Sequence, residues 1–331
     1  MFFSIIIPIY NRPEEIDELL NSLLSQTYTQ PYEIVIVEDG SSLTCEHIVK
    51  KYADQLQISY FFKPNSGPGD SRNYGMHKAK GDYFIIFDSD CLIPNHYLQE
   101  VSRFLNQNYV ACFGGPDAAH ESFSDTQKAI NHTMTSFLTT GGVRGGSEKI
   151  DKFQPRSFNM GLSKEAFLKT KGFAKIHPGE DPDLSIRLWD LGYQTALIPA
   201  AFVYHKRRID FKKFYKQVNK FGKARPILNF WYPKYKRITY WFPVVYTVQF
   251  ITAILLLLAQ VPELFYLNAC YLFLISAQAT FINKSFKIGF LTIFTTWIQF
   301  IGYGLGFVKS YFYVFILKQA PEKALPEMFF K

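Results

Sequence analysis

The sequence predicts an α/β domain with a doubly wound parallel sheet, followed by long apolar helices. Two observations predict this combination. Over residues 2–205, short apolar runs typical of buried strands alternate with segments whose apolar side chains have helical spacing. Over residues 241–308, three stretches lack any charged side chain and are each about as long as a membrane-spanning helix. The 331 residues therefore hold more than one structural unit.

The composition fits folded protein throughout. Hydrophobic residues make up 48% of the chain and aromatic residues 18%, which a disordered chain does not carry. The four cysteines form no CxxC pair, so the sequence indicates neither a zinc site nor a disulfide framework. They are Cys45, Cys91, Cys112 and Cys270.

The elements of the first part follow in order. Residues 2–9 read as a buried strand, and Pro13 begins a helix over residues 14–26, because proline suits the first helical turn. Next come a strand at 32–37, a helix at 44–52, a strand at 58–62, a helix at 71–79 and a strand at 83–87. In a parallel sheet of this kind, ligands bind beyond the carboxyl ends of the strands.

Polar residues follow three of these strand ends. The runs are PIYNR at 8–12, EDGSS at 38–42 and DSD at 88–90. Neither GxGxxG after the first strand nor GxxxxGK[ST] occurs, so dinucleotide-binding and P-loop readings lose support. Asp88 and Asp90 stand two residues apart, a spacing that lets carboxylate oxygen hold one divalent cation while water and phosphate fill its other positions.

Six short motifs then resemble the family 2 glycosyltransferases of the GT-A fold, in order and at the family's spacing over about residues 2–205. They are SIIIPIYN, VEDGSS, NSGPGDSRNYG, FDSD, NMGLSKEAF and GEDPDLSIRL. The resemblance implies an inverting, membrane-associated, metal-dependent enzyme that takes its donor from a nucleotide sugar.

The resemblance also implies roles for residues of the donor site. Asp39 would accept a hydrogen bond from the nucleobase, with uracil and hence UDP the expected case. The second aspartate of the Asp-x-Asp, Asp90, would carry Mg²⁺ or Mn²⁺ bridging the diphosphate. The other nucleotide-sugar contacts would come from Pro8, Ile9, Tyr10, Asn11, Arg72, Asn73 and Asp88.

On the acceptor side, the resemblance implies that Asp181 is the catalytic base and that Glu180 beside it binds the acceptor. Acidic residues at 180, 181 and 183 also suit any helix N-terminus, because of the helix dipole, and that alternative explains them without catalysis. His205 follows a strand-like run at 195–204. It is either a metal ligand or a structural histidine, and the sequence favours neither.

Charge is concentrated before the apolar part. Between Lys206 and Arg237 stand twelve lysines or arginines and one acid, a local net charge of +11. The remaining residues sum to −3, which gives the total of +8. Lys206, Arg207 and Arg208 begin this run and would meet diphosphate, lipid headgroups or only solvent. By the positive-inside rule, this segment holds the preceding domain in the cytosol, at the cell's cytoplasmic membrane.

The three apolar stretches are 241–261, 264–282 and 288–308. Buried core helices are the alternative to membrane helices, but three such stretches exceed what a small soluble domain can hide. The third continues through Gly302, Gly304 and Gly306, so it could kink, lie in the interface or span. Three full spans would put the C-terminus outside.

The expected division is a GT-A catalytic domain at 1–205, a basic juxtamembrane segment at 206–240, two to three membrane helices at 241–318 and a tail at 319–331. The expected activity is transfer of a sugar from a nucleotide sugar to a lipid-linked or glycan acceptor during cell-envelope glycan assembly. Membrane lipids are expected partners and nucleic acid is not.

Three alternatives remain at this stage. A processive polysaccharide synthase would carry a Gln-x-x-Arg-Trp motif before its later spans, where this chain has KFGKAR at 220–225. A nucleotidylyltransferase would want a glycine-rich triphosphate loop near the first strand. A non-catalytic membrane scaffold would keep the fold without needing Asp90 or Asp181, and both are present.

Overall fold

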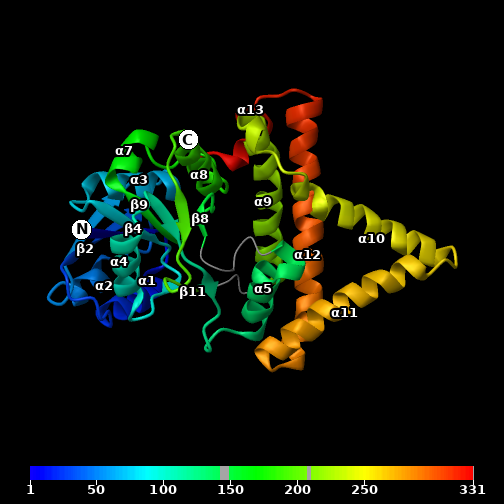
Figure 1. Cartoon of the computed structure of the whole chain (residues 1–331), viewed down its shortest axis with the longest axis horizontal. Coiled ribbons are helices and arrows are strands. Elements are labelled where there is room, and N and C mark those ends of the chain that lie inside the picture. Colours follow the sequence, from blue (N-terminus) through cyan, green and yellow to red (C-terminus); the bar gives the residue numbers. More distant parts are fainter. Residues whose placement is uncertain (142–148, 207–209, 331) are drawn as a thin grey trace. The chain divides into compact units, whose positions relative to one another are not determined.

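The computed structural model describes residues 1–141, 149–206 and 210–330, and it divides the chain into two compact units (Figure 1). The first unit comprises Met1–Ala118, Gly146–His205 and Phe330–Lys331. The second comprises Ala119–Gly145 and Lys206–Phe329. The second segment of the first unit ends at residue 205. Residues 119–145, however, are grouped with the apolar helices in the second unit. Arg207 and Arg208 lie outside the described residues, as do positions 142–148.

The main sheet of the first unit runs in the order β3-β2-β1-β4-β9-β6-β10-β8. Its first four strands are mutually parallel, as the sequence predicts. Strand β9 lies antiparallel between β4 and β6, so the sheet is mixed. The strands are β1 (Phe3–Ile9), β2 (Tyr32–Asp39), β3 (Ile58–Lys63), β4 (Tyr83–Phe87), β6 (Cys112–Gly114), β8 (Lys149–Asp151), β9 (Asn159–Ser163) and β10 (Thr195–Leu197).

Helices cover both faces of this sheet, which explains why its central strands are apolar without interruption. Ile5 and Ile7 of β1 pack in one core with helices α1, α2 and α4, whereas Ile6 between them packs in the other core with α3, α7 and α8. The helices are α1 (Pro13–Leu24), α2 (Glu46–Tyr52), α3 (Pro68–Lys78), α4 (Tyr97–Gln107), α7 (Lys164–Thr170) and α8 (Glu180–Asp190).

The strand expected at 195–204 is two strands. β10 ends at Leu197, the chain turns at Pro199, and β11 (Val203–His205) begins a second, three-stranded sheet. In that sheet β11 lies between β5 (Cys91–Leu92) and β7 (Asp117–Ala118), with His205 paired to Cys91. This small sheet therefore brings His205 to the strand end that carries the Asp-x-Asp sequence.

The second unit is helical. It contains α5 (Asp125–Thr135), α6 (Phe137–Thr140), α9 (Phe211–Trp231), α10 (Phe242–Leu258), α11 (Glu263–Asn283), α12 (Phe286–Tyr311) and α13 (Pro321–Ala324). Three helical segments, Ile238–Leu258, Glu263–Asn283 and Phe286–Ile316, are long and apolar enough to cross a membrane. They coincide with the three apolar stretches of the sequence.

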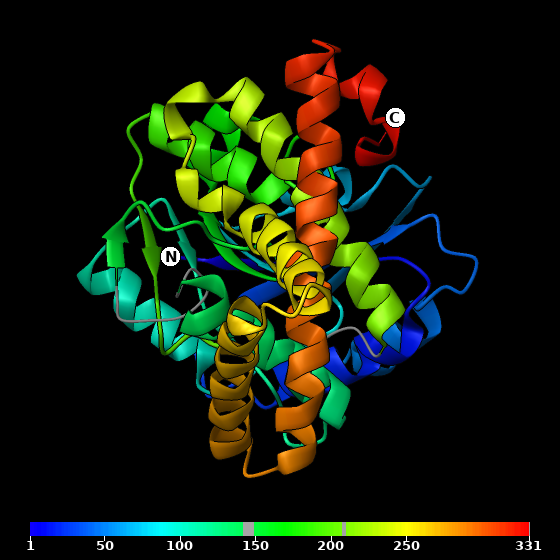
Figure 2. The ribbon, with the colours of Figure 1, turned by 90° about the vertical axis from the view of Figure 1, so that its right-hand side faces the viewer.

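The glycines of the third stretch do not kink it. Figure 2 shows α12 as one continuous helix, which runs on through a π-helical turn at Phe312–Ile316. A Cβ at Gly302 or Gly306 would collide with α9, and a Cβ at Gly304 would come within 3.1 Å of the Pro243 carbonyl oxygen of α10. The glycines therefore let two neighbouring helices approach the backbone of α12 closely.

Candidate active site

The loop after β1 is tied to the loop after β2 by Asn11. Asn11 has a left-handed backbone (φ 54°), and its Oδ1 accepts hydrogen bonds from the backbone N–H groups of Ser42 (2.8 Å) and Leu43 (3.0 Å). Of the loop residues singled out from the sequence, Ile9 is buried and Pro8 is partly buried, whereas Tyr10 is 53% exposed. Tyr10 is thus the side chain of this loop that is free to meet a ligand, while Asn11 fixes the loop's shape.

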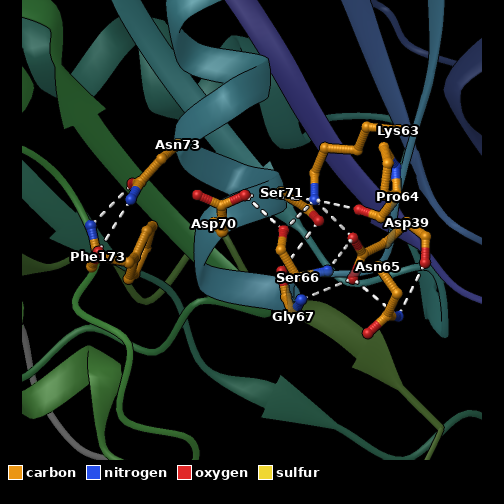
Figure 3. Close-up of polar contacts among 10 residues, drawn as sticks. All are labelled: Asp39, Lys63, Pro64, Asn65, Ser66, Gly67, Asp70, Ser71, Asn73 and Phe173. Atoms are coloured by element: carbon orange, nitrogen blue, oxygen red, sulfur yellow. Dashed lines mark hydrogen bonds and ion pairs between the residues drawn. The ribbon is translucent and has the colours of Figure 1, made fainter. Parts of the chain in front are cut away.

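Asp39, at the end of β2, is buried and holds the loop that follows β3 (Figure 3). Its Oδ1 accepts from Lys63 Nζ (2.6 Å) and from the Ser66 N–H (3.0 Å). Its Oδ2 accepts from the Gly67 N–H (2.9 Å) and from Asn65 Nδ2 (3.2 Å). A carboxylate offers about four acceptor positions, so this network uses all of them.

Gly67 joins this loop to helix α3. Its φ of 95° suits glycine, and the ring of Phe330 lies directly against it. Phe330 also donates its backbone N–H to the Lys175 carbonyl (3.1 Å), and its ring centroid lies 5.7 Å from that of His177. The end of the described chain therefore packs on the first unit beside the Asp39 loop.

Arg72 of α3 connects two groups of carboxylates. It is buried, its Nη2 lies 2.6 Å from Asp88 Oδ1, and its Nη1 lies 3.3 Å from Glu180 Oε1. Burial opposes its charge, but Asp88, Glu180 and Asp181 together raise the pKa of Arg72 above its usual range. The guanidinium is thus a fixed cation between the strand end of β4 and the start of α8.

Asn73, the neighbour of Arg72, uses both ends of its amide within the protein. Its Nδ2 donates to the Phe173 carbonyl (2.9 Å), and its Oδ1 accepts from the Phe173 N–H (2.8 Å), as Figure 3 shows. Asn73 therefore fixes the segment that leads from α7 to α8.

Glu180 and Asp181 begin α8 and lie in different environments. Burial raises the pKa of Glu180, but His177, whose Nδ1 is 2.8 Å from Oε1, and Arg72 outweigh it and lower that pKa to about 2. Burial, followed by the negative charge of Glu180, raises the pKa of Asp181 to about 6. Oδ1 of Asp181 is buried and has no hydrogen-bond partner among the residues that the structure describes. Glu180 is therefore held ionised, whereas the pKa of Asp181 lies close to neutral pH.

Asp90, Cys91 and His205 form a cluster of possible metal ligands. One ligand atom from each lies within 4.8 Å of the others. His205 Nε2 is 3.2 Å from Asp90 Oδ1, and the ring of Phe158 stacks on the imidazole at 4.5 Å between centroids. Asp117 Oδ2 lies 3.9 Å from Nδ1 on the other side of His205. Oxygen and imidazole ligands suit Mg²⁺ or Mn²⁺, and the sulfur of Cys91 would be the softer addition.

The structure brings the sequence-selected residues into three groups. Asp39 lies with the loop after β3, Asp88 and Glu180 meet at Arg72 beside Asp181, and Asp90 meets His205. Sequence reasoning missed Lys63, His177, Cys91 and Asp117. Cys91 stands directly after the Asp-x-Asp, but without a CxxC pair nothing marked it.

Comparison with known proteins bears on the family and the fold. Residues 4–169, half of the chain, match the model of the family described as Glycosyl transferase family 2. An uncharacterized glycosyltransferase of Haemophilus influenzae is 36% identical over 114 residues, 34% of this chain and 45% of that protein. The poly(ribitol-phosphate) beta-N-acetylglucosaminyltransferase TarS of Staphylococcus aureus is 35% identical over 112 residues, 33% of this chain and 20% of that protein. Each match spans less than half of the relative's own length.

Among solved structures, the mannosyltransferase PcManGT from Pyrobaculum calidifontis, in complex with GDP-Man and Mn²⁺, covers 93% of this chain. The match covers 86% of that protein, with a TM-score of 0.57 and 15% sequence identity. At that identity the likeness concerns the fold.

Proposed function

Since this chain belongs to the family 2 glycosyl transferases, we propose that it moves a sugar, with inversion, from a nucleoside-diphosphate sugar to an acceptor held at a membrane. The match spans only part of each curated relative, so donor and acceptor are argued from the site itself.

The observation that carries the proposal is the pair of acids at the start of α8. Glu180 is kept ionised by His177 and Arg72, while burial and Glu180 raise the pKa of Asp181 to about 6. Two carboxylates whose environments push their pKa values apart are typical of acid–base sites. A role in the helix dipole alone does not explain why Asp181 Oδ1 is buried without a hydrogen-bond partner among the described residues.

The proposed reaction gives these residues the following roles. The acceptor hydroxyl oxygen bonds to the anomeric carbon while the bond from that carbon to the diphosphate oxygen breaks. The hydroxyl proton passes to Asp181, and the electron pair of the broken bond leaves with the nucleoside diphosphate. General-base help of this kind contributes roughly 10²–10⁴-fold. Glu180, beside the base, would orient the acceptor, and Asp88, held by Arg72, would lie near the ribose or sugar.

Asp90 and His205 would hold a divalent cation, Mg²⁺ or Mn²⁺. The donor set fits, because the Asp90 carboxylate, directly before β5, and the His205 imidazole, on the paired strand β11, converge with Cys91 in reach. When bound, the cation supplies Lewis-acid stabilisation of the leaving diphosphate. The Mn²⁺ in the complex of PcManGT, which shares the fold, supports this choice.

At the nucleobase end, Asp39 would accept from an N–H of the base. Because its four acceptor positions are in use, a base must displace one donor. The longest of the four bonds, at 3.2 Å, comes from Nδ2 of the exposed Asn65 side chain. The same Nδ2 donates to the Asp39 backbone carbonyl (2.8 Å), so it keeps a partner when the bond to the carboxylate breaks. Asn73 would act through the segment it holds, and Pro8, Ile9, Tyr10 and Asn11 would line the base.

The acceptor is proposed to be membrane-held because three helices of the second unit are long and apolar enough for a bilayer. The cations of α9 support a cytosolic position for the first unit, at the cytoplasmic membrane, by the positive-inside rule. Without the Gln-x-x-Arg-Trp motif, transfer of single sugars is favoured over processive synthesis, in cell-envelope glycan assembly.

The test is nucleoside-diphosphate release by protein in detergent or nanodiscs, with lipid extract, across UDP- and GDP-sugars and with Mg²⁺, Mn²⁺ or chelator. We expect one donor to turn over, and turnover to require the cation. Asp90→Ala should abolish metal-dependent turnover, and Asp54→Ala, an exposed position on the first unit, should not. Absence of turnover with every donor and the lipid extract would favour the scaffold alternative.

A further inference from the structure

Helix α9 runs beside α12 in the same direction over most of its length. Near the start of α9 the ring centroids of Phe211 and Phe294 are 6.4 Å apart, and near its end those of Phe230 and Phe315 are 6.1 Å apart. Between them, Asn219 Nδ2 donates to the Gly302 carbonyl (3.0 Å). Residues of α9 thus lie at the same level as the central residues of α12.

That alignment conflicts with a transmembrane α12. Lys212, Lys213 and Lys216 are exposed and lie between the Phe294 and Gly302 levels, in the middle of the charge-free stretch 288–308. If α12 crossed the bilayer, these ammonium groups would sit near its centre, where charged side chains are costly unless they face a protein interior or water.

The two ends of α12 also lead to the same side. At its start, Lys287 Nζ lies 2.8 Å from Asp125 of α5, and Thr295 Oγ1 lies 2.6 Å from Thr133 Oγ1. Helix α5 belongs to a segment inserted between two parts of the first unit. The first part ends at Ala118 and the next begins at Gly146.

Beyond its end, Lys223 of α9 pairs with Glu327 (3.0 Å), and the chain returns to the first unit at Phe330. The Phe330 N–H bonds to the Lys175 carbonyl within that unit. The chain between His205 and Phe330 must therefore cross a bilayer an even number of times.

Helices α10 and α11 differ from α12 in how much of their surface the protein covers. Only 17% and 22% of their most apolar windows are buried, against 44% for α12. Large exposed apolar side chains lie in and near the turn between them, at Leu258 of α10, Val261 of the turn and Leu267 of α11. At 1.5 Å per residue, the two 21-residue segments are each about 31 Å long, the thickness of a hydrocarbon core.

We propose that α10 and α11 cross the membrane as a hairpin, while α12 lies in the membrane–water interface with α5 and α9. In that position α12 needs no length match to the bilayer, although its 31 residues extend about 46 Å. The lysines of α9 then lie at the level of lipid phosphates, which attract them. Residues 284–287 and 317–330 are on the side of the first unit, and the hairpin tip at 259–262 is on the other.

The test is one-sided labelling of single cysteines with a membrane-impermeant maleimide in right-side-out and inverted vesicles. The background is Cys270→Ser, because the other three cysteines are buried. The reporters are Lys284→Cys before α12, Gln319→Cys after it, Gln260→Cys at the hairpin tip and Asp54→Cys on the first unit. Labelling after detergent solubilisation shows that each cysteine is reactive, and Asn283→Cys and Ala320→Cys replace any reporter that misfolds.

We expect positions 54, 284 and 319 to be labelled in one vesicle orientation and position 260 in the other. Labelling of 284 and 319 in opposite orientations would show that α12 crosses and would overturn the proposal. Labelling of 260 together with 54 would overturn the crossing hairpin. None of these outcomes depends on whether the chain has glycosyltransferase activity.

Discussion

At the scale of single residues, the first acids of α8 show how neighbouring groups of one type acquire different chemistry. Glu180 faces His177 and Arg72 and stays ionised, whereas Asp181 is desolvated beside the negative charge of Glu180. The sequence can place two acids at a helix start, but their difference depends on residues distant along the chain.

We predict that turnover rises with pH through about 6, because a base whose pKa is raised to about 6 is protonated, and inactive, below that value. In Glu180→Gln the charge that helps to raise the pKa of Asp181 is gone, so the rising limb should move to lower pH. The check is kcat against pH for both proteins. If kcat of Glu180→Gln rose over the same pH range as that of the unchanged protein, the charge of Glu180 would not be a cause of the raised Asp181 pKa.

The proposed nucleobase contact of Asp39 gives a second residue-level prediction. Asp39→Asn should weaken donor binding strongly, because an amide cannot accept all four hydrogen bonds that hold the loop. Asn65→Ala should leave donor affinity unchanged or improve it, because the displaced bond is already absent. Calorimetric titration with the nucleoside diphosphate measures both, and weaker binding in Asn65→Ala would refute the displacement.

Several residues of the candidate site can be picked out from the sequence alone, and the others cannot, for a physical reason. Asp39, Asp90 and Asp181 stand in short local motifs, which a single sequence displays. Lys63, His177 and Asp117 act through partners that folding brings close, and their own neighbourhoods carry no motif. Cys91 went unmarked because the sequence offers no second cysteine at ligand spacing.

At the scale of elements, the strands and helices before residue 87 could be read from periodicity because each has a strongly apolar face. The antiparallel β9 could not, since its orientation is set by partners rather than by its own residues. The prediction of one strand over residues 195–204 is wrong, because the structure has two strands there. Pro199 interrupts this run, and proline cannot donate to a sheet hydrogen bond.

The glycines of α12 could be read either as a kink or as a contact, and the structure favours the contact. Gly306→Val should destabilise the protein by about 1–3 kcal/mol, because the new side chain collides with the Asn219 carbonyl of α9. The neighbouring Leu305→Ala, at a position 50% exposed, should cost much less. Thermal unfolding in detergent compares the two, and equal losses would count against close α9–α12 packing.

At the scale of the whole molecule, the chain passes between the two units more often than a linear sequence division suggests. Residues 119–145 join the second unit and Phe330 returns to the first. Composition identifies the apolar helices, but it does not reveal that residues 119–145 pack with them. That packing depends on contacts such as the one between Asp125 and Lys287.

If α9 lies at the headgroups, anionic lipid should stabilise the protein. We expect a higher Tm in nanodiscs with anionic lipid than in zwitterionic ones, at about 1 kcal/mol per cation near the surface. Changing Lys212, Lys213 and Lys216 to glutamate should remove this gain. The same changes at Lys51, Lys80 and Lys164, which are exposed on the first unit, should not. A gain that persists in the α9 variant would contradict the assignment.

The central claim is sugar transfer with Asp181 as the base, and Asp181→Asn tests it most directly when donor affinity and turnover are measured on the same preparation. The account predicts that donor binding is kept while turnover falls roughly 10²-fold or more, the contribution of general-base catalysis. Turnover close to that of the unchanged protein, with donor binding also intact, would contradict it.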